Sequence, residues 1–78
     1  MVEVRKRSGK REPFTMAKVA SSIVRAGGTV ELAEEVAERV FESVKGAAEV
    51  STQRIKELVS SFLGERNREV AEAYGEGK

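Results

Sequence analysis

The 78-residue sequence contains no cysteine, no histidine and no aspartate. Without cysteine it cannot form a disulfide, a thiolate nucleophile or a thiolate-based zinc site. Without histidine and aspartate it lacks the commonest general base, the commonest metal ligand and most triad chemistry. This inventory argues against an enzyme, and the spacing of the glutamates singles out no metal site.

Long apolar runs are also missing. No stretch approaches the roughly 20 apolar residues needed to cross a bilayer. The charged N-terminus leads into a strand pattern instead of the apolar segment of a signal peptide. We therefore expect a cytoplasmic protein that does not bind membranes. Residues 1–78 suffice for one domain, near the lower size at which a core holds without disulfides or metals.

Positive charge is concentrated at the start of the chain, although the net charge is only +1. Residues 1–18 hold six Lys/Arg and two Glu, a net charge of +4, whereas residues 19–78 hold eight Lys/Arg and eleven Glu, a net charge of −3. Such a local patch suits a compact polyanion such as a nucleotide better than a long duplex, which usually requires a wider basic face. The six cations are Arg5, Lys6, Arg7, Lys10, Arg11 and Lys18.

Residues 2–14 read as an antiparallel β-hairpin. Apolar and polar residues alternate from Val2 to Arg5, Ser8-Gly9 supplies a two-residue turn, and the chain then returns toward Phe14. Glu49-Val50 is a short extended stretch that could add an edge strand beside the hairpin.

Four stretches have helical periodicity, at about residues 15–27, 30–46, 51–65 and 67–75. Thr15 and then Ser51 or Thr52 are suited to cap the first and third helices, and Gly27-Gly28 to end the first. The prediction is an α+β fold in which a small antiparallel hairpin or three-stranded sheet packs on a four-helix bundle. The tail from Gly75 to Lys78 is expected to fray. The third helix has the cleanest apolar stripe, formed by Ile55, Leu58, Val59, Phe62 and Leu63.

Cations stand near the start of two predicted helices. Lys18 lies in the first turn of one, and Arg54 and Lys56 lie in the first turns of another. A helix start carries partial positive charge and favours acidic residues. These positions make sense if an anion is held there by backbone N–H groups, Lys18 and the hairpin cations Lys6 and Arg7. The alternative is that the basic hairpin is only a solvated surface.

The closing Gly-Glu-Gly-Lys is not a Walker A motif. It lacks the preceding strand, the Ser/Thr and the following helix. The sequence therefore excludes a P-loop hydrolase.

Short motifs follow one another along almost the whole chain: Val4-Arg5-Lys6-Arg7-Ser8-Gly9, Glu12-Pro13-Phe14-Thr15, Lys18-Val19, Val50-Ser51-Thr52 before Ile55, and Val70-Ala71 with Tyr74. In order and spacing they resemble the ATP-cone domain. That family is the allosteric ATP/dATP-binding module at the N-terminus of many ribonucleotide reductases and in the repressor of their operons. The fold that the resemblance implies, a small antiparallel sheet over a four-helix bundle, agrees with the one read from the residues.

The resemblance implies a non-catalytic regulatory domain that binds ATP or dATP together with Mg²⁺. Lys6 and Arg7 would contact phosphate and the sugar–base side of the nucleotide, and Lys18 would bind phosphate. The implied partner is a ribonucleotide reductase or repressor domain acting in trans, or a second copy of the chain.

The resemblance also implies that Glu12 and Thr15 are hydrogen-bond partners of the base. Thr52 at the third helix start, with Lys56 one turn further on, completes the implied nucleotide site. The chain departs from the family at Ser8, where the family usually has aspartate, and in the tail, where Lys78 would supply a last cation.

Two alternatives stay open at this stage. One is an ATP cone that has lost nucleotide binding and serves only as an interaction module. The other is a small nucleic-acid-binding domain, although single-strand binders usually set exposed aromatics among their cations. The hairpin cations it would use are Arg5, Lys6, Arg7, Lys10 and Arg11.

Overall fold

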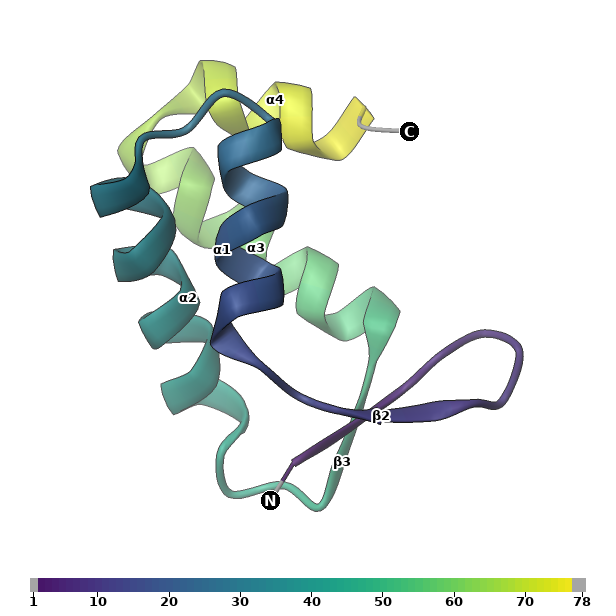
Figure 1. Cartoon of the computed structure of the whole chain (residues 1–78). Coiled ribbons are helices and arrows are strands. Elements are labelled where there is room, and N and C mark those ends of the chain that lie inside the picture. The colour runs from purple at the N-terminus through teal and green to yellow at the C-terminus, as the bar shows by residue number, and fades with distance from the viewer. Residues whose placement is uncertain (1, 77–78) are drawn as a thin grey trace.

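The computed structural model describes residues 2–76, with side chains described through residue 75. It contains a three-stranded sheet and four helices, which confirms the α+β class (Figure 1). No helix within this range is both long and apolar enough to cross a membrane. The elements in chain order are β1 (Glu3–Arg5), β2 (Arg11–Pro13), α1 (Met16–Arg25), α2 (Val30–Val44), β3 (Glu49–Ser51), α3 (Thr52–Arg66) and α4 (Arg68–Glu76).

The sheet is mixed, with strand order β2-β1-β3. The hairpin strands β1 and β2 pair antiparallel, as predicted, but β3 pairs parallel to β1. The predicted antiparallel hairpin and three-stranded sheet are therefore present, but the sheet is mixed and not antiparallel throughout, as the resemblance had implied. Helices α1 and α2 lie between the hairpin and β3 along the chain, and such a long crossover lets β3 enter the sheet in the direction of β1.

The hairpin turn spans three residues, Arg7 to Gly9, instead of the predicted two. The amide of Lys6 donates to the carbonyl of Lys10 at 2.8 Å, and the amide of Gly9 donates to the carbonyl of Lys6 at 2.9 Å. Gly9 has a φ of 93°, as expected for the left-handed residue that follows a type I turn in three-residue hairpins.

Side-chain caps set the helix starts. The Thr15 hydroxyl accepts from the amide of Lys18 at 3.4 Å and begins α1. Ser51, not Thr52, caps α3 by accepting from the amide of Arg54 at 3.0 Å. Helix α1 ends just before Gly27, whose φ of 105° fits the predicted glycine stop.

The helices pack mainly as two pairs, α1 with α2 and α3 with α4. Contacts of α2 with α3, and smaller contacts of α1 with α4, join the pairs. The structure thus shows the four predicted helices and these pairwise contacts between them. The side chains of Ile23, Val36, Val40, Val59 and Leu63 are fully buried between the helices.

The end of α4 differs from the prediction. The helix runs through Gly75 to Glu76, so these two residues continue the helix instead of belonging to a frayed tail. Tyr74 packs partly buried against the core, as the predicted inward position required. The predicted roles of Gly77 and Lys78 lie outside the described residues.

Candidate functional site

The parallel pairing of β1 with β3 brings the basic hairpin beside the start of α3. In the parallel pairing of β1 with β3, Arg5 stands opposite Ser51. The residues that follow them, Lys6 and Thr52, therefore leave the sheet at the same end of the two strands. The Thr52 hydroxyl donates to the carbonyl of Arg5 at 3.4 Å. This contact joins the hairpin to the N-terminus of α3.

An open cleft of about 660 Å³ lies at this junction. Four of the predicted nucleotide-binding residues line it: Lys6 and Arg7 from the hairpin, and Thr52 and Lys56 from α3. We call it the hairpin–α3 cleft. Because the first turn of a helix has backbone N–H groups without intrahelical partners, its N-terminus favours an anion. The remaining lining residues are Arg5, Gly9, Ser51 and Gln53.

The predicted residue Glu12 lies between two predicted phosphate ligands. Its carboxylate accepts from Lys18 Nζ at 2.7 Å and forms an ion pair with Lys6 Nζ. We call these three residues the Glu12 cluster. The hydrogen bond from Lys18, followed by that from Lys6, lowers the pKa of the Glu12 carboxyl group from 4.5 to about 2. Glu12 is therefore ionised at neutral pH.

The Glu12 cluster removes part of the reason for expecting a bound anion at the helix starts. Lys18 is not a cation without an acid, because Glu12 supplies one across the junction between β2 and α1. Arg54 has an acid too, since its guanidinium lies 3.4 Å from the carboxylate of Glu57. Of the three cations near helix starts, Lys56 alone forms no ion pair within the described part of the chain.

Arg7 also forms no ion pair or side-chain hydrogen bond among the described residues. Arg7, from the hairpin, and Lys56, from α3, thus both line the hairpin–α3 cleft without ion-pair partners among the described residues. Thr15 and Lys18, by contrast, line neither this cleft nor the one beside it. The seven predicted residues therefore fall into a cleft set and a set around Glu12, with Lys6 common to both.

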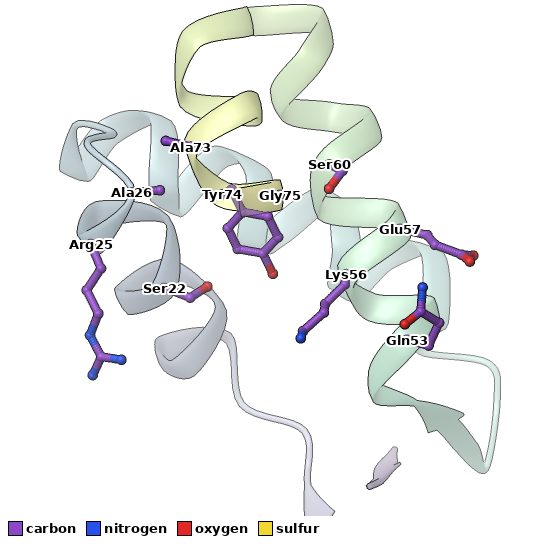
Figure 2. Close-up of a pocket in the computed structure, with 10 residues that line it drawn as sticks. All are labelled: Ser22, Arg25, Ala26, Gln53, Lys56, Glu57, Ser60, Ala73, Tyr74 and Gly75. Atoms are coloured by element: carbon purple, nitrogen blue, oxygen red, sulfur yellow. The ribbon is translucent and has the colours of Figure 1, made fainter. Parts of the chain in front are cut away.

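A second cleft, of about 870 Å³, adjoins the first between α1, α3 and α4. Gln53 and Lys56 line both clefts. Figure 2 shows the Tyr74 ring lying between Ser22 of α1 and Lys56 of α3. Burial raises the pKa of the Tyr74 phenol, and a hydrogen bond with Ser22 partly opposes this rise. We call this second space the Tyr74 cleft.

Sequence reasoning missed the polar lining of the Tyr74 cleft, in particular Ser22, Arg25 and Gln53. One signal was available: Gln53 precedes Lys56 by three residues, which places both on one face of a helix. Ser22 and Arg25 come from a distant helix, and only the packing of α1 near α4 brings them to Tyr74.

No group of three or more His, Cys, Asp or Glu residues that could hold a metal ion occurs in the described part of the chain. Any divalent cation at the hairpin–α3 cleft would therefore depend on oxygen ligands from a bound anion and water.

Comparison with known proteins gives two findings. The family model of the ATP cone domain matches residues 2–76, nearly the whole chain. A protein of Archaeoglobus fulgidus described as uncharacterized is 45% identical over 40 residues, which make up 51% of this chain and 85% of that protein.

Proposed function

The chain belongs to the ATP-cone family, and from this premise we propose that it is a non-catalytic regulatory domain that binds ATP or dATP. The observation that carries the proposal is the hairpin–α3 cleft. There, Arg7 and Lys56 line the same cleft without ion-pair partners among the described residues, beside the N-terminus of a helix.

In this proposal the phosphates occupy the hairpin–α3 cleft. The Arg7 guanidinium offers several donors in a fixed plane that suits phosphate oxygens, and Lys56 adds a point charge. The Thr52 hydroxyl and the free amides of the first turn of α3 donate further hydrogen bonds. Lys6, which lines the cleft and also pairs with Glu12, lies where the phosphates and the rest of the nucleotide would meet.

The Glu12 cluster would then recognise the base. The exocyclic amino group of adenine can donate to a carboxylate, whereas guanine has a carbonyl oxygen at the same ring position. Because the pKa of Glu12 is about 2, its carboxylate accepts and does not donate at neutral pH, so at this ring position it can pair with the amino group of adenine and not with the carbonyl oxygen of guanine. When Glu12 turns to the base, Lys18 becomes free for phosphate, and the Thr15 hydroxyl lies at the same helix start.

Mg²⁺ would enter the hairpin–α3 cleft on the triphosphate. No carboxylate is among the described residues that line this cleft, and two carboxylates of the adjoining sheet are already engaged, Glu12 by two lysines and Glu49 by Arg5 at 3.1 Å. Phosphate oxygens and water would therefore supply most of the coordination that Mg²⁺ requires.

As a sensor of adenine nucleotides, the protein would act in the cytoplasm and pass its nucleotide state to another domain. We propose a ribonucleotide reductase or an operon-repressor domain in trans, or a second copy of the chain, as the recipient. A ligand that bridges the hairpin and α3 would hold together two segments that otherwise meet through β1, β3 and one hydroxyl contact.

A thermal-shift titration tests this function. A ligand that binds only the folded state stabilises it by RT ln(1 + [L]/Kd), about 2.7 kcal/mol at a hundredfold excess over Kd. ATP and dATP should raise the melting temperature in a saturating manner, and GTP should raise it less. The absence of any shift with millimolar nucleotide would refute the sensor and favour a degenerate cone.

The nucleic-acid hypothesis receives less support from the contacts. Two of its five cations, Arg5 and Arg11, lie 3.1 and 3.7 Å from the carboxylate of Glu49. The aromatic side chains Phe14, Phe62 and Tyr74 pack against the core, and Phe41 stacks on Phe14, instead of standing among the cations. DNA binding that survives physiological salt and is abolished by Arg11→Ala would revive this hypothesis.

A further inference from the structure

A shallow groove crosses the outer side of α2, the helix that Figure 1 shows away from the hairpin. Its volume is about 680 Å³. Three helices contribute apolar side chains to it, Met16 from the start of α1, Phe41 from α2 and Phe62 from α3. We call it the α2 groove. Glu38, Arg39, Glu42 and Ser43 complete its lining.

The apolar part of the α2 groove is fixed in place and partly exposed. Phe41 stacks on Phe14 with the ring centroids 6.0 Å apart. Met16 remains 42% exposed, one of three large apolar side chains left open to solvent in the described part of the chain. An apolar surface that is held in place and left in contact with water is stabilised when another apolar surface covers it.

The acidic rim gives this groove a definite charge. Of the charged side chains that line it, Glu38 and Glu42 are acidic and Arg39 is basic. Glu38 forms no ion pair among the described residues, and Glu42 pairs with Lys45 at 2.8 Å on the exposed surface. The one cation in the lining, Arg39, is engaged: its guanidinium lies 4.6 Å from the centre of the Phe62 ring and 3.6 Å from the carboxylate of Glu65.

We propose that the α2 groove docks a basic amphipathic helix of a partner protein. Apolar side chains one turn apart on that helix would fill the space over Met16, Phe41 and Phe62, and its flanking lysines or arginines would face Glu38 and Glu42. The rim charge decides the class of partner, because nucleic acids and anionic lipid surfaces are repelled by carboxylates. The groove shares no lining residue with the hairpin–α3 cleft, so this proposal does not depend on nucleotide binding.

The test uses the whole chain without nucleotide. The probe is a designed peptide of about four helical turns, with leucine on one face and lysine elsewhere. Calorimetry should give saturable binding, and amide NMR shifts should concentrate at Met16 and at residues 38–43. A scrambled peptide of the same composition should bind at least about tenfold more weakly, because it cannot present an apolar face and a basic face together.

Two matched pairs of variants separate the groove from general surface charge and apolarity. Met16→Gln is compared with Val24→Gln, since both side chains lie on α1 with 42% and 43% exposure. Glu38→Lys is compared with Glu31→Lys, since both are exposed glutamates of α2 and only Glu38 lines the groove. The first member of each pair should weaken peptide binding about tenfold, and the second should change it less than about twofold.

Circular dichroism melting of each variant checks that the fold is retained. Equal binding of the scrambled peptide, equal losses in both members of a pair, or no binding at millimolar peptide would overturn the proposal. Concentration-dependent self-association that Met16→Gln removes, measured by sedimentation, would overturn the chosen partner and show that a second copy fills the groove.

Discussion

The two sets of candidate ligands differ in what their cations touch before any ligand arrives. In the Glu12 cluster, Lys6 and Lys18 already hold a carboxylate, which is 28% exposed and thus partly shielded from water. In the hairpin–α3 cleft, Arg7 and Lys56 hold no acid within the described residues. A phosphate entering the cleft therefore meets cations that need not leave a partner. The same phosphate at the Glu12 cluster must displace an anion, which reduces its net gain.

Arg7→Ala and Lys56→Ala should have the largest effects, and they test the difference between the cleft and the Glu12 cluster most strongly. Each should remove a charge-assisted contact worth about 1.5–3 kcal/mol, which lowers ATP affinity about 10- to 150-fold. Calorimetric titration of both variants measures the loss. Lys10→Ala is the matched control, because Lys10 is an exposed cation of the same hairpin that does not line the cleft. A control that loses as much affinity would mean that the hairpin acts only through its overall charge.

Thr52→Val should have the next largest effect. The substitution removes a neutral hydrogen bond to phosphate, worth about 0.5–1.5 kcal/mol or roughly two- to tenfold in ATP affinity. Thr52→Ser should restore binding, because it keeps the hydroxyl. The melting temperature without nucleotide should fall only slightly, because the variant loses the hydroxyl contact with the Arg5 carbonyl but keeps the Ser51 cap of α3. Unchanged ATP affinity in Thr52→Val would place the phosphates away from the start of α3.

Lys18→Ala should weaken ATP binding only about threefold, because in the free protein Lys18 is already paired with Glu12 and lies outside the cleft. The melting temperature without nucleotide should stay within error, because the pair is exposed, with Lys18 70% accessible. The same calorimetric series measures this variant. A loss equal to that of Lys56→Ala would reverse the ranking of the two sets.

The smallest expected effect is the pH dependence of the Glu12 cluster. The folded-state pKa of Glu12, about 2, lies below its ordinary value of 4.5. Its contribution to stability is therefore present above pH 4.5 and is lost as the pH falls from 4.5 toward about 2. The difference in melting temperature between the wild type and Glu12→Gln should shrink across this window. A difference that stays constant down to pH 2 would show that the carboxylate is not held by the lysines.

Local patterns in the sequence predicted the helices and their caps well. The apolar stripe from Ile55 to Leu63 identifies α3, and Thr15 and Ser51 cap the helices expected of them. These features depend on residues within a few positions of each other, which is the range over which helical periodicity and capping act.

The features that failed depend on tertiary geometry. A strand of three residues, Glu49–Ser51, carries no sign of its direction, so the parallel pairing that builds the hairpin–α3 cleft could not be read from it. Glu12 is six residues from both Lys6 and Lys18, and neither pair lies within one helix or one strand. The hairpin register places Glu12 diagonally across from Lys6, and the junction between β2 and α1 adds Lys18.

An amide NMR titration with ATP tests the central claim most directly, because it reports both sets of residues in one experiment. If the phosphates occupy the hairpin–α3 cleft, the largest shifts occur at Arg7, Thr52 and Gln53, and smaller shifts occur at Glu12 and Lys18. Shifts confined to the start of α1, or no shifts at millimolar ATP, would contradict it.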